Sequence, residues 1–341
     1  MPPKNKLKFK NYKIMKKILF AVLALAAMAS CSKDEVIEVN REQIGFGDVF
    51  VDNATRVDYS NANALQGFNV YGTVTGAAGA GSTTVALYGG NGATVKRNSK
   101  AYGVAWDCSE TEYWVPGASY KFAAVVDATT AVVAGLPTTL TTIDDDAETG
   151  NMNLKDMLYA EASVASATAD QGLVQFTFNH LLSKVHFTVT SDAANGYSHT
   201  VTGIKVANFE EGTYTIAGGT WEASTADDNK KDVVFADIAE VTAKDAQGND
   251  VKKTNADMLL VPNAATFNVT FTVDLYKGNT KLGTQTKTVP VTIKDAQNNV
   301  VGLQKGHAYN FTIDCSVGNP IQFSVTNDPA WDTTNGNVTV Q

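Results

Sequence analysis

Residues 267–275 read FNVTFTVDL, and every second residue is apolar. Because successive side chains of a β-strand point to opposite faces, the five apolar side chains share one face and the four polar ones share the other. This pattern predicts a strand with one buried face. Gly278-Asn279 follows as a turn signal, and a second extended segment runs to Pro290, whose missing N–H indicates an edge strand or a strand end.

The same alternation recurs along the chain, with Gly, Asn and Asp clusters between the segments. It occurs at 174–178, 185–189, 201–206, 214–216, 233–235, 309–313 and 321–325. Short strands at such spacing favour antiparallel β-sandwiches. Only 151–164 is expected to form a short helix or helical turn. Dinucleotide-binding α/β folds, TIM barrels and helix bundles are excluded, because no strand–helix alternation and no long helical periodicity is present.

The first 30 residues have the pattern of a secretory signal. Lys16 and Lys17 precede an apolar run of 12 residues, 18–29, which is shorter than the roughly 20 residues that span a bilayer. The basic residues 1–14 either extend the signal or precede a true start at Met15. Residues 1–30 are therefore set apart from the fold.

Met28-Ala29-Ser30-Cys31 ends the apolar run and resembles the lipobox of bacterial lipoproteins. The resemblance implies cleavage between Ser30 and Cys31 and acylation of Cys31, which would anchor the protein in the outer membrane. The charged residues 32–35 are similar to a signal for the outer face of that membrane. The alternative is a secreted protein in which Cys31 is incidental.

The charge of the chain is divided unevenly. Its 27 Lys and Arg and 35 Asp and Glu give a net charge of −8, but seven of the lysines and no acidic residue precede residue 32. The remainder therefore carries −15. Such an acidic body, with arginine only at 41, 56 and 97, matches phosphate backbones poorly, which excludes nucleic acid as a partner.

No motif points to catalysis, a metal or a cofactor. The four histidines are dispersed, no HExxH or G-x-S-x-G motif occurs, and the Gly-rich segments lack the lysine of a phosphate-binding loop. The acidic run 144–148 and the two KDAQ stretches at 244 and 294 are interpreted as loops and turns. Cys108 and Cys315 are expected to be buried small side chains, with a disulfide left open. We therefore expect a protein that is not an enzyme.

An aromatic cluster at 113–122 allows two interpretations. Trp114 and Tyr120 surround a Pro-Gly turn and could form a platform for stacking a sugar ring. The favoured interpretation is a core cluster that seals the end of a sandwich, because aromatic side chains are more often buried.

The length exceeds what one hydrophobic core usually organises, so two domains are expected. The small-residue stretch 165–172 gives the best boundary. After the signal peptide and a segment over 31–56, the expected domains are 57–170 and 171–341.

Several short motifs follow one another over nearly the whole mature chain. They are Cys31 with its lipobox, 44–46 (IGF), 53–56 (NATR), 113–116 (YWVP), 156–160 (DMLYA), 178–185 (FNHLLSKV) and 306–309 (GHAY). Their order resembles the fimbrillin family of type V pilus lipoproteins, especially its minor-fimbrium-like branch. The resemblance implies two tandem β-sandwich domains of transthyretin-like, Greek-key topology. It also implies a fimbrial, cell-surface subunit that polymerises with other subunits and can bind a host or bacterial surface ligand.

In that family an N-terminal strand fills a groove, an arginine-specific protease removes it, and the next subunit supplies a replacement strand. The strand to be exchanged would carry Ile44, Phe46, Val49 and Val51, with a bulge suggested by the shift between Phe46 and Val49. Arg56 is the preferred cleavage site and Arg41 the alternative. The strand could instead remain permanently in place.

A donor strand is expected at the C-terminus. Its apolar residues would be Ile321, Phe323, Val325, Val338 and Val340. The same segment could instead complete the second domain of its own chain. A glycan-binding outer-membrane surface lipoprotein is the competing function.

Overall fold

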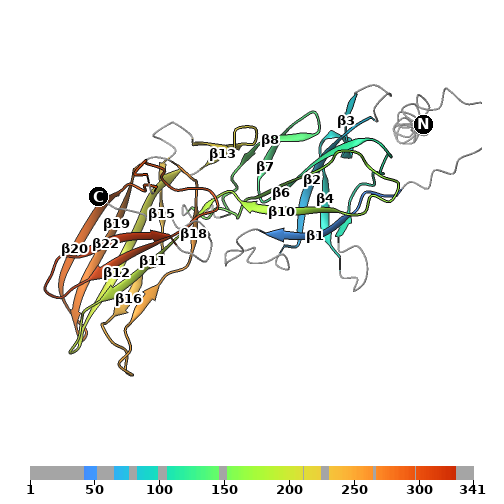
Figure 1. Ribbon diagram of the computed structural model, residues 1–341. Coiled ribbons are helices and arrows are strands. Elements are labelled where there is room, and N and C mark those ends of the chain that lie inside the picture. The colour runs from blue at the N-terminus through green and yellow to red at the C-terminus, as the bar shows by residue number, and fades with distance from the viewer. Residues whose placement is uncertain are drawn as a thin grey trace, which may run out of the picture.

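The computed structural model describes residues 42–51, 65–76, 83–98, 106–145, 152–209, 211–223, 230–263, 266–295 and 297–327. In these residues the protein is all-β, with four sheets, one 3-10 turn (η1, Tyr88–Gly90) and no α-helix. It is elongated, and the N-terminal strands and the C-terminal strands lie toward opposite ends (Figure 1). None of the described segments forms a helix with the length and apolar character that a membrane span requires.

The N-terminal end is built on an eight-stranded sheet in the order β1-β10-β9-β6-β2-β4-β5, with β3 added to β2. Its strands are β1 (Phe46–Val51), β2 (Gly67–Thr75), β3 (Thr84–Ala86), β4 (Ala93–Arg97), β5 (Trp106–Cys108), β6 (Ser119–Val126), β9 (Leu158–Val164) and β10 (Val174–His180).

A four-stranded sheet in the order β14-β13-β8-β7 joins the two ends of the molecule (Figure 1). Two of its strands, β7 (Thr129–Val133) and β8 (Leu136–Thr141), come from the N-terminal half, whereas β13 (Gly212–Thr215) and β14 (Thr220–Ala223) come from the C-terminal half. The shared sheet therefore ties the two ends together through backbone hydrogen bonds between β8 and β13.

The C-terminal end consists of two five-stranded sheets that face each other. The first has the order β17-β11-β21-β22, with β18 also paired to β11. The second has the order β15-β12-β19-β20, with β16 also paired to β12. Phe267 of β19 stacks on Phe311 of β21, and Phe271 of β19 stacks on Phe323 of β22, at centroid distances of 6.1 and 6.0 Å. The strands are β11 (Ser183–Ser191), β12 (Tyr197–Phe209), β15 (Lys230–Val234), β16 (Ile238–Val241), β17 (Lys252–Thr254), β18 (Met258–Leu260), β19 (Phe267–Lys277), β20 (Thr280–Val291), β21 (Ala308–Cys315) and β22 (Gln322–Asn327).

The strand and turn predicted at 267–280 are confirmed. Phe267, Val269 and Phe271 are buried, and each contributes roughly 1.5–3 kcal/mol by leaving water. Gly278, with φ of 54°, occupies the left-handed conformation that a two-residue hairpin turn requires. The second strand, β20, is the edge strand that Pro290 indicated.

The predicted helix within 151–164 is wrong, because residues 158–164 form β9 between β10 and β6. Leu154, Met157 and Leu158 have the three- and four-residue spacing of a helix face, and this local pattern was misleading. Leu158 and Ala160 are buried, whereas Tyr159 and Glu161 lie on the other face, so the true period is two.

The expectation of antiparallel sheets holds for all but two of the described strand pairs. β1 pairs with β10 and β11 pairs with β21 in parallel, while the other strand pairs are antiparallel. Both parallel pairs join segments more than 100 residues apart, so no hairpin fixes their direction.

Buried apolar side chains form two hydrophobic clusters. The N-terminal cluster contains Phe176 and Phe178 of β10, whereas Leu181 and Leu182, which directly follow β10, belong to the C-terminal cluster. Residues 174–180, which the sequence analysis assigned to the second domain, therefore pack in the first cluster. The C-terminal cluster also takes in Tyr71 and neighbours from the first half.

Candidate functional site

The segment 42–51 is held by main-chain hydrogen bonds to two different parts of the chain. The N–H of Ile44 donates to the carbonyl of Glu112 at 2.8 Å, and the N–H of Trp114 donates to the carbonyl of Glu42 at 3.0 Å. The chain then turns onto β10, where the N–H of Val174 donates to Gly45, and runs parallel to it up to Val51. No other described strand pairs with β1, so β1 forms the end of its sheet.

Three side chains of this segment enter the N-terminal cluster. Ile44, Phe46 and Val49 expose only 2%, 1% and 3% of their surface. Phe46 lies between two rings, stacked on Phe176 at 5.9 Å and edge-on to Phe68 at 5.8 Å. Such an arrangement adds about 1 kcal/mol to the burial of each ring. β1 therefore supplies part of the core rather than only a sheet edge.

The bulge predicted between Phe46 and Val49 is confirmed as a register shift against β10. It changes the spacing of inward side chains from two residues to three, and Val51, two residues further, is half-buried. Phe50 points outward and exposes 54% of its surface. The groove that β1 occupies therefore fits a strand whose inward apolar side chains are two residues apart, except at the bulge, where they are three residues apart.

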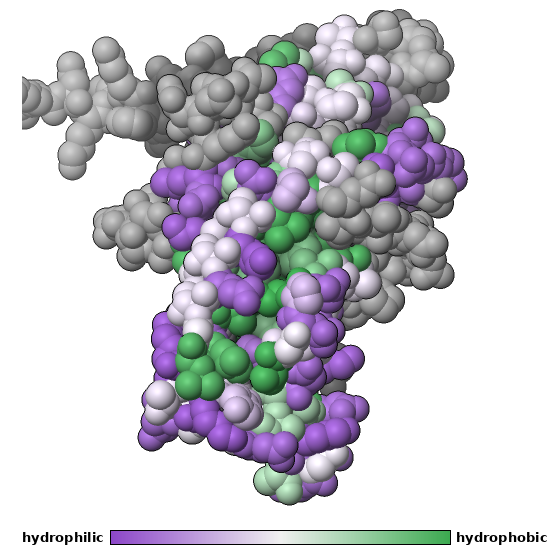
Figure 2. Space-filling model, turned by 90° about the vertical axis from the view of Figure 1, so that its left-hand side faces the viewer, coloured by the Kyte–Doolittle hydropathy of each residue, from purple (hydrophilic) through white to green (hydrophobic). Residues whose placement is uncertain are grey.

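The C-terminal segment also lies at a sheet edge, because β22 pairs with β21 alone among the described strands. Val325 is 2% exposed, Ile321 is half-buried, and the half-buried Phe323 contacts the rings of Phe271 and Phe311. All three therefore pack on the C-terminal cluster of their own chain. Figure 2 looks onto this end of the molecule and shows apolar surface between polar borders.

Six sequence-predicted residues lie outside the described residues: Ser30, Cys31, Arg41, Arg56, Val338 and Val340. Arg56 falls in the connection between β1, which ends at Val51, and β2, which begins at Gly67. The structure brings Ile44, Phe46 and Val49 together in one groove, and it keeps them apart from Ile321, Phe323 and Val325, which belong to the other cluster.

The core interpretation of the aromatic cluster is confirmed. Trp114 is 2% exposed and packs edge-on against Tyr120 and Phe122, with ring centroids 4.7 and 5.9 Å away. Tyr120 is equally buried, and its hydroxyl accepts the N–H of Val115 at 2.7 Å. The indole of Trp114 is therefore unavailable for stacking on a sugar.

A buried carboxylate–imidazole pair was missed by the sequence analysis. Asp156 is fully buried, His180 is 5% exposed, and an oxygen of Asp156 lies 2.9 Å from Nδ1 of His180. The pair joins the start of β9 to the end of β10, where the two clusters meet. The signal in the sequence was that both residues lie in the short motifs 156–160 and 178–185, each directly before an apolar residue.

A second ionic group lies on β11. Nδ1 of His186 and Nζ of Lys184 lie 3.0 and 3.6 Å from the carboxylate of Asp257, and the Lys184 side chain is 3% exposed. Burial alone would raise the pKa of Asp257, but the hydrogen bond with His186 and the charge of Lys184 outweigh it and hold that pKa below its usual range. The group stabilises the buried lysine.

Cys108 is half-buried and Cys315 is buried, and both are free thiols. Burial raises the pKa of each thiol, to about 12 for Cys315, so neither has the thiolate character of a reactive cysteine. Within the described ranges no three His, Cys, Asp or Glu side chains are grouped so as to hold a metal ion.

Comparison with known proteins places this fold in a family. Residues 55–329 match the family described as fimbrillin-like. The fold is similar to that of a fimbrial protein from Bacteroides vulgatus, with 16% identity and a TM-score of 0.53 over 85% of this chain and 99% of that one. A candidate cell adhesion protein from Bacteroides uniformis has 18% identity and a TM-score of 0.47 over 86% and 99%. Among curated proteins none matches this chain. The chain belongs to the fimbrillin-like family of fimbrial and cell-adhesion proteins.

Proposed function

We propose that this chain is a structural and adhesive subunit of cell-surface fimbriae, assembled by strand exchange after proteolytic removal of β1. Family membership implies the cell-surface location and the assembly with other fimbrial subunits. The observation that supports the exchange is the arrangement of the segment 42–51. Among the described strands its β1 pairs with β10 alone, and its Ile44, Phe46 and Val49 lie in the N-terminal cluster.

Loss of the segment 42–51, which contains β1, would leave two kinds of unsatisfied surface. The main-chain groups of β10 and of Glu112 and Trp114 would lose their partners, and the apolar side chains around Phe46 would face water. Three buried side chains represent about 5–9 kcal/mol of burial, at 1.5–3 kcal/mol each. An incoming strand of similar pattern would restore both contributions, which is the driving force of β-strand addition.

The position of β1 distinguishes between the two arginines. A cut at Arg41 leaves β1 joined to β2 through residues 52–66, whereas a cut at Arg56 separates β1 from the body. We therefore assign maturation to Arg56. The same cut would release the lipid on Cys31, so the subunit would leave its outer-membrane anchor when it enters the polymer. Permanent retention of β1 is the alternative.

We also propose that the fold is two transthyretin-like, Greek-key sandwich domains in tandem. The two hydrophobic clusters support this division. Because β10 packs in the first cluster, the boundary is moved from 170/171 to the residues after His180. The four-stranded sheet would then be the connection between the domains.

The donor strand is assigned to residues 328–341, which include Val338 and Val340. Donation by Ile321, Phe323 and Val325 would require β22 to leave β21 and the C-terminal cluster, which would cost the burial of all three side chains.

The test uses the purified, non-acylated precursor and an arginine-specific protease, with Arg56→Lys and Arg41→Lys as a matched pair. We expect wild type and Arg41→Lys to be cut early after Arg56 and then to form SDS-resistant ladders, and Arg56→Lys to do neither. Mass spectrometry of the N-terminus on intact cells reads Cys31 acylation and Arg56 processing together. Ladders of unchanged yield from Arg56→Lys would contradict the proposal.

The competing function is a glycan-binding outer-membrane surface lipoprotein, for which Trp114 was the candidate residue for stacking on a sugar. The burial of that indole excludes stacking at this position. Binding of a glycan therefore needs a different surface.

A further inference from the structure

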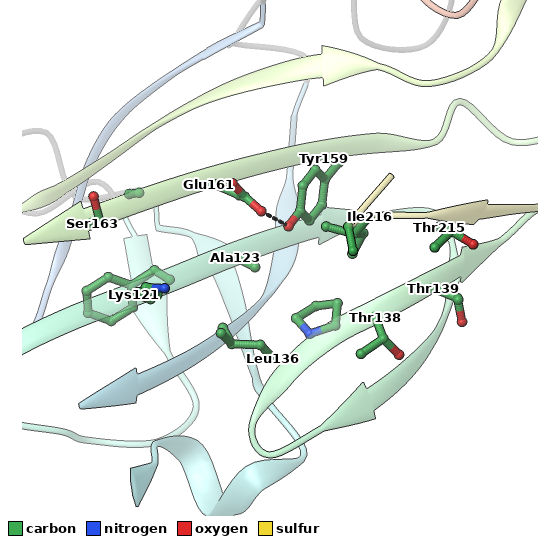
Figure 3. A pocket seen from close by; sticks show the side chains of 14 residues that line it. Lys121, Ala123, Leu136, Thr138, Thr139, Tyr159, Glu161, Ser163, Thr215 and Ile216 are labelled. Carbon is green, nitrogen blue, oxygen red and sulfur yellow. Dashed lines mark hydrogen bonds between the residues drawn. The ribbon is translucent and has the colours of Figure 1, made fainter. Parts of the chain in front are cut away.

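A cleft of about 590 Å³ lies where the eight-stranded and four-stranded sheets meet (Figure 3). Its floor is the outer face of β6 and β9, which presents Lys121, Ala123, Tyr159, Glu161 and Ser163. Its wall is formed by β8 and by the residues that follow β13. The cleft is thus built from both halves of the chain, and it has the size and the domain-junction position of small-molecule sites, which span about 300–1,000 Å³.

The wall is held in place by close packing at both ends. At the β7–β8 turn, Gly135 has φ of 85°, and a Cβ there would lie 2.4 Å from the Cβ of Ala86. At the other end, the indole N–H of Trp221 on β14 donates to the carbonyl of Leu181 at 3.0 Å. The cleft is therefore preformed, so a ligand does not have to order its wall.

The floor of the cleft carries both hydrogen-bond donors and hydrogen-bond acceptors. The hydroxyl of Tyr159 donates to Oε1 of Glu161 at 2.5 Å, which fixes the carboxylate and leaves its second oxygen to accept from a ligand. Burial and this hydrogen bond raise the pKa of Tyr159, so the phenol stays protonated. Lys121 stands on the neighbouring strand, on the same face.

The chemistry of the cleft favours a neutral, hydroxyl-rich ligand. Among the described lining residues, Lys121 and Glu161 cancel each other's charge and no arginine is present, which disfavours phosphates and carboxylates. The hydroxyl groups of Thr139 and Thr215 can each donate and accept, as sugar hydroxyls do, whereas the hydroxyl of Thr138 donates to the carbonyl of Ala131 at 3.3 Å. The lining also contains apolar surface that the C–H face of a sugar ring can cover, from Leu136, Pro137 and Ile216.

We propose that this cleft binds a neutral saccharide of one or two rings. The carboxylate of Glu161 accepts from ring hydroxyls, Lys121 donates to a ring or hydroxyl oxygen, and the Tyr159 ring and Leu136 cover the apolar face. This proposal specifies the ligand class for the adhesive part of the proposed function, and it does not depend on removal of β1.

The test measures binding by the monomeric precursor to a panel of neutral mono- and disaccharides, followed by isothermal titration of the best one. We expect Glu161→Gln to weaken binding about tenfold, because it removes a charge-assisted hydrogen bond. Glu110→Gln, an exposed glutamate outside the cleft, is the matched control and should leave affinity unchanged. Ala217→Trp, at an exposed lining position, should abolish binding by filling the cleft.

Thermal unfolding confirms that each variant is folded. Absence of binding to the whole panel at millimolar concentrations overturns the proposal, as does binding that survives both Glu161→Gln and Ala217→Trp. Preference for acidic sugars would also overturn it. The variants should still be cut at Arg56 and polymerise normally, so a failure of strand exchange is separable from a failure of this site.

Discussion

β1 and β22 are both terminal strands of their sheets, but they are attached to the fold in different ways. β22 follows β21 directly, and Asp192 fixes the connection by accepting the hydroxyl of Ser316 at 2.5 Å and the N–H of Val317 at 2.8 Å. β1 instead pairs in parallel with β10, more than 100 residues later. One cut in the connection to β2 would therefore break the covalent link between β1 and the strands that follow it, whereas β22 is joined to its partner by a short turn. The comparison shows that β1 combines deep side-chain burial with a partner remote in sequence, which is the arrangement that the proposed exchange requires.

The largest expected effect is on the buried ring of β1. Phe46→Ala should destabilise the uncleaved precursor by about 3–5 kcal/mol, because it leaves a cavity between Phe68 and Phe176. Urea unfolding measures the loss. Phe50→Ala, at an outward position on the same strand, should cost less than about 0.5 kcal/mol. Equal costs for the two variants would show that β1 does not fill the cluster.

The two edges can be compared directly with one substitution in each. Val49→Ala in β1 and Val325→Ala in β22 remove side chains of the same size and similar burial, 3% and 2% exposed, and each should cost about 2 kcal/mol in the precursor. After the cut at Arg56 and release of β1, only Val325→Ala should still lower the free energy of unfolding. If Val49→Ala still lowers the free energy of unfolding of the cleaved subunit, β1 has remained bound.

The ionic group on β11 predicts loss of stability in acid. The pKa of Asp257 is lowered in the folded state, so its contribution is present at neutral pH and is lost as pH falls below about 4, toward and through the folded-state value. Asp257→Asn should cost about 2 kcal/mol at pH 7, because Lys184 loses a charged partner. The difference in free energy of unfolding between wild type and Asp257→Asn should shrink as the pH falls. A constant difference from pH 7 to pH 3 would contradict this role.

The smallest expected effect concerns the turn that secures β22. The hydroxyl of Ser316, with the N–H of Val317, lowers the pKa of the exposed Asp192, so the turn is stabilised above the ordinary carboxyl pKa and weakens as pH falls through the lowered value. Asp192→Asn should increase amide hydrogen exchange in β22 at neutral pH without changing exchange in β1. Unchanged exchange in β22 would show that the turn is held by other contacts.

Short-range patterns gave reliable predictions wherever the interaction itself was short-range. The two KDAQ stretches are an example: Asp245 accepts the N–H groups of Gln247 and Asn249, and Asp295 accepts those of Gln297 and Asn299 in the same way. Each turn closes within five residues, so local chemistry determines it. The helix predicted at 151–164 failed because the partners that make β9 a strand, β6 and β10, lie elsewhere in the sequence.

The candidate sites divide in the same way. The apolar pattern of Ile44, Phe46 and Val49, including the bulge, could be read directly from the sequence, since the period of a strand is a local property. The cleft could not be predicted from the sequence, because Lys121, Glu161 and Thr215 come from three strands that only the sheet pairing brings together.

The sequence by itself determined that this protein is all-β, that a hairpin turn falls at Gly278-Asn279, and which face is apolar in the strands with clear alternation, such as 267–275. Only the tertiary structure decided which strands pair, that β1 runs parallel to β10 and β21 parallel to β11, and that β10 belongs to the first cluster. The reason is physical: side-chain alternation depends on the backbone geometry of neighbouring residues. Strand partners depend instead on competition among distant segments for the same buried surface and the same main-chain hydrogen bonds.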